Sequence, residues 1–158
     1  MKIIFSIILV VFFGSLLSQK TYYTNYRPLA DSLSSVFQIP ACVILSVAYL
    51  ESGGGKSKVA INLNNHFGIV GKNNLMQTKG IKTKYKYYNS VTDSYIGFCK
   101  LVASKKYYAE LKGNDDVEKW VLAIASQGYA KNAKKWSQYT IKLLHKNCPT
   151  KLEAETIK

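Results

Sequence analysis

The fold of this chain is decided by residues 39–57, which read IPACVILSVAYLESGGGKS from Ile39 to Ser57. The segment 41–50 is apolar on nearly every face, and a helix that is apolar all round is a buried one. Pro40 suits the first position of this helix because its φ angle is already fixed near the helical value. Three glycines end the helix, with Gly53 or Gly54 as the left-handed cap. The run is too short to span a bilayer, which takes roughly 20 apolar residues.

The last turn of this helix carries a single carboxylate, Glu51. Ile44, Ala48 and Glu51 follow one another along one helix face, so the Glu51 side chain is predicted to border the core or a cleft. Desolvation and the negative end of the helix dipole both raise the pKa of a carboxyl group placed there. Glycosidases use such a protonated acid as a general acid, whereas the alternative is a solvated glutamate at a helix end.

The composition is strongly basic and rich in tyrosine. The chain has 22 Lys and Arg residues against 9 Asp and Glu, a net charge of +13, and 12 tyrosines. Such a surface suits an anionic polysaccharide, an anionic lipid or a nucleic acid. Arg27 is the single arginine, however, and nucleic-acid recognition favours the guanidinium fork. We therefore predict no nucleic-acid partner.

Residues 1–18 have the pattern of a secretory signal peptide. Lys2 supplies the positive start, residues 3–17 are mostly apolar, and Ser18-Gln19 is the expected cleavage point. An uncleaved anchor is the alternative, but the apolar run is short for it. The predicted domains are the signal peptide, a catalytic domain over 19–149 and a frayed tail over 150–158. The mature protein is expected in the periplasm, the cell wall or the extracellular space, without stable membrane insertion.

The cysteines and histidines do not indicate a metal site. Cys42 and Cys99 lie in apolar helical runs and are predicted to pack as small hydrophobic residues. In an oxidising compartment one pair among Cys42, Cys99 and Cys148 could form a disulfide, and the sequence leaves the pairing open. There is no C-x-x-C spacing, and His66 and His145 are too few for a histidine-based zinc site. No metal and no cofactor are expected.

Apolar periodicity predicts further helices around the buried one, at 28–38, 57–63, 90–104, 107–111, 115–128 and 132–146. Ser90-Val91-Thr92-Asp93 has a capping-box pattern that opens the third of these. After a possible hairpin turn at Lys79-Gly80, residues 81, 83, 85 and 87 (Ile, Thr, Tyr and Tyr) alternate with lysines, which is a strand period, so a two-stranded β excursion is expected within residues 72–88. The predicted fold is therefore α+β and mainly α. It is a helical domain with a small β-hairpin lobe, a cleft between the two, and Glu51 facing the cleft.

Four segments, in order, resemble the glucosaminidase domain of bacterial autolysins and flagellar-rod muramidases, glycoside hydrolase family 73. Residues 50–57 (LESGGGKS) are similar to its L-E-S-G-x-G-K-S signature, and residues 64–69 (NNHFGI) to its N-N-x-F-G-I-K segment. Residues 85–95 resemble its F-R-x-Y-x-S-x-x-x-S-F segment, and residues 128–130 (GYA) the start of its G-Y-A-T-D-P segment. Order and spacing hold from about residue 39 to residue 146.

The resemblance implies a lysozyme-like fold and cleavage of β-1,4 bonds in the peptidoglycan glycan strand, usually after N-acetylglucosamine. It makes Glu51 the general acid and Tyr129 an aromatic residue that holds the sugar or the reaction centre. Four more residues are assigned to substrate binding: Asn65, Phe67, Tyr87 and Tyr88. The alternatives are turn packing for Asn65 and Phe67 and cross-strand packing for Tyr88.

The sequence departs from the family pattern at two places. Glu51 is the only carboxylate between Asp31 and Asp93, whereas many relatives carry a second one in the β excursion. Asp93 is expected to serve a helix cap, so we predict a mechanism with one protein carboxylate. The substrate's 2-acetamido group then attacks the anomeric carbon, or Tyr129 and backbone groups hold a water molecule. Residues 131–133 (KNA) replace the family's T-D-P.

Other functions stay open at this point. A lytic transglycosylase or muramidase also fits a lone glutamate followed by serine, and residues 74–77 (NLMQ) are similar to the G-L-M-Q segment of transglycosylases. A non-catalytic cationic wall-binding protein fits the missing second carboxylate. The expected partner is the peptidoglycan glycan strand, with an immunity protein or inhibitor added if the chain is a toxin.

Overall fold

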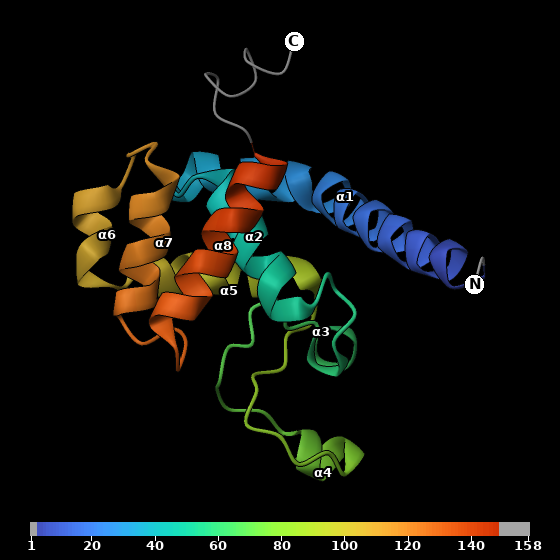
Figure 1. Cartoon of the computed structure of the whole chain (residues 1–158). Helices are drawn as coiled ribbons and strands as arrows, with labels where there is room; N and C mark the ends of the chain where they lie inside the picture. The colour runs from blue at the N-terminus through green and yellow to red at the C-terminus, as the bar shows by residue number, and fades with distance from the viewer. Residues whose placement is uncertain (1–2, 149–158) are drawn as a thin grey trace.

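The computed structural model describes the backbone of residues 3–148 and the side chains of residues 19–148 (Figure 1). Within this range the chain forms eight helices and no strand: α1 (Ile3–Phe37), α2 (Ala41–Ser52), α3 (Lys58–Leu63), α4 (Leu75–Lys79), α5 (Val91–Ala103), α6 (Lys106–Leu111), α7 (Val117–Ser126) and α8 (Ala133–Asn147). None of the described helices is long and apolar enough to cross a membrane. The signal peptide stays a prediction, and the expected tail at 150–158 lies outside the described residues.

Helix α2 lies at the centre of the helical body, as its sequence predicts. Its residues from Val43 to Ala48 are all buried, and it packs against α1, α5, α7 and α8. The helix ends at Gly53, which has φ 59° and ψ 43° and therefore takes the predicted left-handed cap. Pro40 precedes the helix as its N-cap instead of occupying the first turn. The apolar run thus fixes both the position of α2 and the place where it stops.

Helix α1 is longer than the sequence pattern predicts. The pattern places a helix at 28–38 after a polar lead-in, whereas the structure continues the helix through residues 21–27 and Pro28. Pro28 has no N–H group, so the carbonyl of Thr24, four residues earlier, loses its helical hydrogen bond. Both residues are exposed, so water can replace this bond. The tyrosines of the segment are drawn into the core, since Tyr22 and Tyr23 are buried.

The buried tyrosines of α1 anchor the loop that follows α3. The hydroxyl of Tyr22 lies 2.7 Å from Nδ1 of His66 and 3.0 Å from the hydroxyl of Tyr95 on α5. Burial lowers the pKa of His66 to about 4, so this cluster is uncharged at neutral pH. The loop 64–69, which carries the N-N-x-F-G-I resemblance, is therefore anchored to α1 and α5.

Side-chain caps begin four of the described helices, among them the cap that the sequence predicts at Ser90. In each case a side chain accepts a hydrogen bond from the backbone N–H three residues further on, at 3.0 to 3.1 Å. The capping residues are Ser57 for α3, Ser90 for α5, Asp116 for α7 and Asn132 for α8. These local bonds set where each helix begins.

The predicted β-hairpin is not confirmed among the described residues. Two arms run antiparallel, but they share only one isolated bridge, between Val70 and Tyr85. The short helix α4 forms the far end, where the pattern predicts a tight turn (Figure 1). Asn73 links the arms by donating to the carbonyls of Thr83 and Tyr85 at 3.1 and 2.8 Å. Two backbone hydrogen bonds, from Gly71 to Lys84 and from Lys86 to Ile69, and the Asn73 amide together join the arms of this two-armed lobe, residues 69–87.

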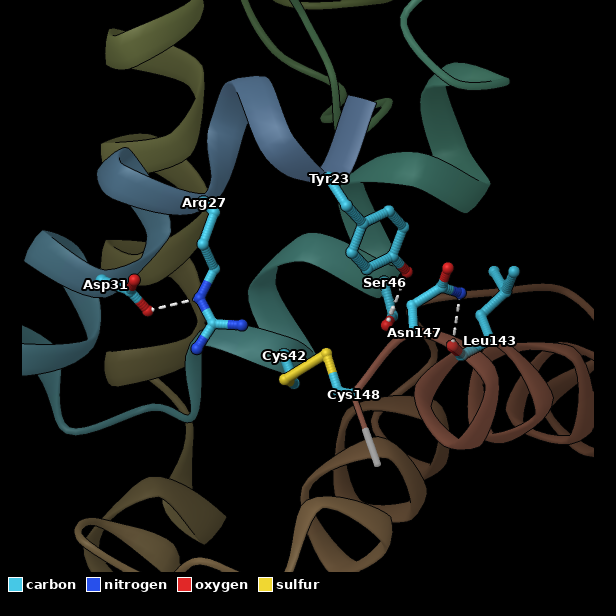
Figure 2. The surroundings of a disulfide bond; sticks show 8 residues. All are labelled: Tyr23, Arg27, Asp31, Cys42, Ser46, Leu143, Asn147 and Cys148. Atoms are coloured by element: carbon cyan, nitrogen blue, oxygen red, sulfur yellow. Dashed lines mark hydrogen bonds and ion pairs between the residues drawn. A yellow bond between two sulfur atoms is a disulfide. The ribbon is translucent and has the colours of Figure 1, made fainter. Parts of the chain in front are cut away.

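A disulfide joins Cys42 at the start of α2 to Cys148 just after α8 (Figure 2). The prediction that Cys42 packs as a free hydrophobic residue is therefore wrong, because α8 returns across the start of α2 and brings the two thiols together. Cys99 is a buried free cysteine, as predicted. The bond joins two positions that are 106 residues apart in the sequence, and it links the two helices.

Replacing both Cys42 and Cys148 with serine is expected to lower the free energy of unfolding by about 3–5 kcal/mol, because the unfolded chain regains the entropy of a long loop. Urea unfolding measures the loss, and Cys99→Ala serves as the single-thiol control. Without reductant the unfolded wild-type chain should expose one reactive thiol. Three thiols under those conditions would show that the bond does not form.

Candidate active site

A cleft of about 270 Å³ opens beside the C-terminal end of α2. It lies between that helix end, the loop 67–70, the junction of α5 with α6, and the segment after α7. Its lining residues are Glu51, Phe67, Gly68, Ile69, Val70, Leu101, Val102, Lys105, Tyr107, Ile124, Gln127, Gly128 and Tyr129. Glu51 is the one carboxylate among these described residues, and Lys105 is the one amine. The cleft therefore combines apolar walls with a single acidic group.

Glu51 is half-buried in this cleft and is held by a partner from α8. Its Oε1 accepts a hydrogen bond of 2.6 Å from the indole Nε1 of Trp136. Burial raises the carboxyl pKa, and the indole N–H offsets part of this rise because it stabilises the ionised form. The direction of the shift agrees with the expectation from the sequence, where desolvation at the helix end is the main cause.

Gly68 faces the other oxygen of the carboxyl group. Its φ angle is +62°, a conformation that side chains with a Cβ atom rarely adopt. A Cβ atom at this position would lie 3.5 Å from Oε2 of Glu51. The glycine therefore leaves free space on the cleft side of Oε2, while Trp136 covers the side of Oε1.

Tyr129 lines the same cleft, next to the carboxyl group. Its hydroxyl donates a 2.8 Å hydrogen bond to the backbone carbonyl of Phe67, and its ring centroid lies 5.3 Å from that of Trp136. Burial, together with the negative charge of Glu51, raises the pKa of Tyr129 well above its usual value. Its hydroxyl is therefore neutral, and its proton is already engaged by the Phe67 carbonyl.

Asn65 and Phe67 support the loop that forms one wall of the cleft. Asn65 is 1% exposed, and its amide donates to the carbonyls of Ile69 and Lys86 at 2.9 and 2.8 Å. Its side-chain oxygen also accepts from the N–H of Ile69 at 3.1 Å. The ring of Phe67 stacks on Phe98 of α5 with centroids 4.3 Å apart. Both residues position the loop 67–70, and direct substrate contact stays a prediction for them.

Tyr87 and Tyr88 do not line this cleft. Tyr88 is 6% exposed, and a Cβ atom on Gly97 would lie 2.6 Å from its hydroxyl oxygen, so the tyrosine packs closely on α5. Tyr87 is half-buried in the two-armed lobe, with Nζ of Lys79 5.7 Å from its ring centroid. The assignment of both residues to substrate binding remains a prediction.

Several residues of the cleft are not apparent from the sequence. Trp136 belongs to the apolar stripe of α8, and its periodicity indicates only that it points inward. Lys105, Tyr107 and Gln127 lie at helix junctions, where no motif marks them. Asp93, the nearest candidate for a second carboxylate in the sequence, is exposed in the first turn of α5 and does not line the cleft.

A half-buried carboxylic acid in a cleft between a helical body and a smaller lobe is the arrangement of a glycosidase that uses a general acid. Among the described residues, no group of three or more His, Cys, Asp or Glu could hold a metal ion. The family model of glucosaminidase, described as mannosyl-glycoprotein endo-beta-N-acetylglucosaminidase, matches residues 27–148. The chain belongs to this glucosaminidase family and is a glycoside hydrolase, as the sequence resemblance implies.

Solved structures share the fold at low sequence identity. The catalytic domain of the autolysin Auto from Listeria monocytogenes is 18% identical with a TM-score of 0.68, over 82% of this chain and 84% of that one. The glycoside hydrolase domain of FlgJ from Salmonella typhimurium is 20% identical with a TM-score of 0.63, over 88% and 92%.

A type VI secretion system effector–immunity complex from Pseudomonas protegens also contains a similar chain. It is 20% identical with a TM-score of 0.60, over 82% of this chain and 94% of that one. Among curated protein sequences, none matches the chain. The helical body around α2 therefore shares its fold with the similar chains in these structures.

Asn65→Ala tests whether this residue supports the loop or binds substrate. Removing this buried amide leaves the Lys86 carbonyl and the Ile69 N–H without their Asn65 partner, so the free energy of unfolding should fall by about 2–3 kcal/mol. Urea unfolding measures this, and the amide of Lys86, bonded to the Ile69 carbonyl at 2.9 Å, should exchange faster with solvent.

Asn73→Ala is the matched control for this variant. Asn73 makes the same kind of bonds between the arms, but it lies outside the cleft and is less buried, so a smaller loss of about 1 kcal/mol is expected. An Asn65→Ala protein with wild-type stability and weaker substrate binding would instead support the substrate-binding role.

Proposed function

We propose that this protein is a secreted peptidoglycan hydrolase, an endo-β-N-acetylglucosaminidase that cleaves β-1,4 bonds of the glycan strand with Glu51 as its general acid. The observation that carries the proposal is the half-buried Glu51 carboxyl group in the cleft at the end of α2. Membership of the glucosaminidase family supports the bond type. The likeness to a peptidoglycan hydrolase from Sphingomonas sp. A1 supports the substrate.

The first chemical step is proton donation by Glu51. Its raised pKa keeps the carboxyl group protonated at a pH where an exposed glutamate is already ionised. The acid gives its proton to the glycosidic oxygen as the bond to the anomeric carbon breaks. Apolar cleft walls limit competing water around the acid, which strengthens this proton transfer.

The substrate itself supplies the nucleophile that attacks the anomeric carbon, and a water molecule then attacks the same carbon, breaks the bond to that nucleophile and supplies the new hydroxyl group. In the described cleft Glu51 is the only carboxylate, so no protein group there is placed to act as a nucleophile. The neutral Tyr129 hydroxyl is a poor base, because its proton is bonded to Phe67 and its pKa is raised. The 2-acetamido group of N-acetylglucosamine supplies an oxygen nucleophile in its place, and the product then retains its configuration.

The site of action follows from charge and chemistry. Peptidoglycan carries carboxylates on its stem peptides, and the net charge of +13 attracts such a polymer. Residues 1–18 direct export, and the Cys42–Cys148 bond suits an oxidising compartment. Likeness to a chain in a type VI secretion system effector–immunity complex supports an antibacterial role with an immunity protein as partner.

Glu51→Gln is expected to lower turnover on purified peptidoglycan by at least about a hundredfold, since the amide cannot donate an acidic proton. The variant should fold, because its amide oxygen can still accept from Trp136. A raised carboxyl pKa means that the folded state loses stability as pH rises through that pKa, so the uncharged variant should be at least as stable at neutral pH.

Glu118→Gln is the control for this variant. Glu118 lies on the surface of α7, where its Oε1 is 2.8 Å from Nε2 of His145. Its activity should match that of the wild type. Turbidity clearing of cell-wall suspensions measures both variants, and equal activity of Glu51→Gln and wild type would contradict the proposed function.

A second reaction is favoured by the single carboxylate in the described cleft. A lytic transglycosylase also uses one glutamate and leaves an anhydro-muramyl end instead of a reducing end. Mass spectrometry of a peptidoglycan digest separates the two reactions. We expect reducing N-acetylglucosamine ends, whereas anhydro-muramyl ends would assign the transglycosylase reaction to the same cleft.

A further inference from the structure

Trp136 makes the shortest polar contact of the candidate general acid. Its indole Nε1 donates to Oε1 of Glu51 at 2.6 Å, at the lower end of the range for N–H···O bonds. The two residues are 85 positions apart, and each comes from a different helix. Trp136 is 8% exposed, so this contact is shielded from bulk water. Such a shielded bond is stronger to an ionised carboxylate than to the neutral acid.

The indole ring is fixed in place from several sides. It packs against the Tyr129 ring, with centroids 5.3 Å apart. The backbone carbonyl of Trp136 accepts from the hydroxyl of Thr140 at 2.9 Å within α8. Helix α8 packs on α2, and the Cys42–Cys148 disulfide joins the same two helices. The donor is therefore held in a defined position relative to the helix that carries the acid.

We propose that Trp136 is a positioning residue that holds Oε1 of Glu51, so that Oε2 carries the transferable proton and faces the cleft beside Gly68. This inference rests on the proposed function and adds a role that the sequence resemblance does not assign. The carbonyl oxygen of a carboxylic acid is a better acceptor than its hydroxyl oxygen, so we assign Oε1, which accepts from Trp136, as the carbonyl oxygen. The proton then resides on Oε2, on the side that glycine leaves open.

The same bond affects the acidity of Glu51. Burial raises the carboxyl pKa, and the indole N–H lowers it because the bond strengthens when the acceptor is charged. The other titratable groups around the carboxyl group are Tyr129 after α7, Tyr107 of α6, and Lys105 at the α5–α6 junction. Tyr85 of the two-armed lobe lies next to Gly68. None of these groups replaces the indole bond, so its loss should raise the pKa further.

Trp136→Phe removes the indole N–H and keeps an aromatic ring. We expect kcat on peptidoglycan fragments to fall by about tenfold or more, with KM nearly unchanged, because an unfixed acid donates its proton less efficiently. The high-pH limb of the kcat profile should move to higher pH, because the general acid must be protonated to act. A purely structural role would lower the amount of folded enzyme without moving this limb.

Trp120→Phe is the matched control. Trp120 is fully buried on α7, and its indole donates to the carbonyl of Asn114 at 2.9 Å, away from the cleft. The control loses the same kind of bond in the core, and its pH profile should match that of the wild type. A Trp136→Phe enzyme with wild-type kcat and pH profile would overturn the positioning role.

Tryptophan fluorescence tests the contact without any substrate. The chain contains two tryptophans, so Trp120→Phe leaves Trp136 as the only tryptophan, which is excited selectively over the tyrosines at 295 nm or above. Its emission should change as Glu51 titrates, at a pH above the ordinary pKa of glutamate, and Glu51→Gln should abolish the change. Absence of the change in the wild type and in Trp120→Phe would overturn the proposal. An inactive wild type that still shows the change would overturn the proposed function alone.

Discussion

A carboxyl group at the end of a fully buried helix is the constraint on which this structure depends. Helix α2 buries apolar side chains on all faces, and α1, α5, α7 and α8 cover it. The last turn therefore ends beside a cleft, and Glu51 occupies that turn. Partial desolvation follows from this position, and the raised pKa follows from the desolvation. The chemistry of the site is thus a consequence of where an apolar helix stops.

The surroundings of the acid come from segments far apart in the chain. Trp136 of α8 covers one carboxyl oxygen, and Gly68 of the loop leaves the other accessible. The loop itself is fixed from behind by an uncharged cluster in which Tyr22 of α1 contacts His66. Asn65 then joins the loop to the second arm of the lobe. Each of these supports uses neutral hydrogen bonds, so the described cleft is built with few charges near its acid.

Short-range signals made much of this fold predictable, because the caps at Ser57 and Ser90 depend on groups only three residues away. Helical periodicity also placed the candidate acid beside the core. The continuation of α1 through Pro28, the pairing of Cys42 and the bond from Trp136 depend on packing between distant segments, which a single sequence does not show. The structure of the two-armed lobe differs from the predicted β-hairpin for another reason. Alternating lysines and aromatic residues predict an extended chain, but they do not predict how its two arms are joined.

The disulfide determines what remains of the molecule after a protease cuts the chain. The exposed two-armed lobe, residues 69–87, is the kind of segment that proteases cut first, and it lies between Cys42 and Cys148. A single cut there produces two pieces that stay covalently joined, with α2 and α8 still tethered at their ends. The nicked molecule therefore keeps both halves at high effective concentration. In an environment without chaperones, this linkage gives a damaged molecule the chance to hold its cleft together.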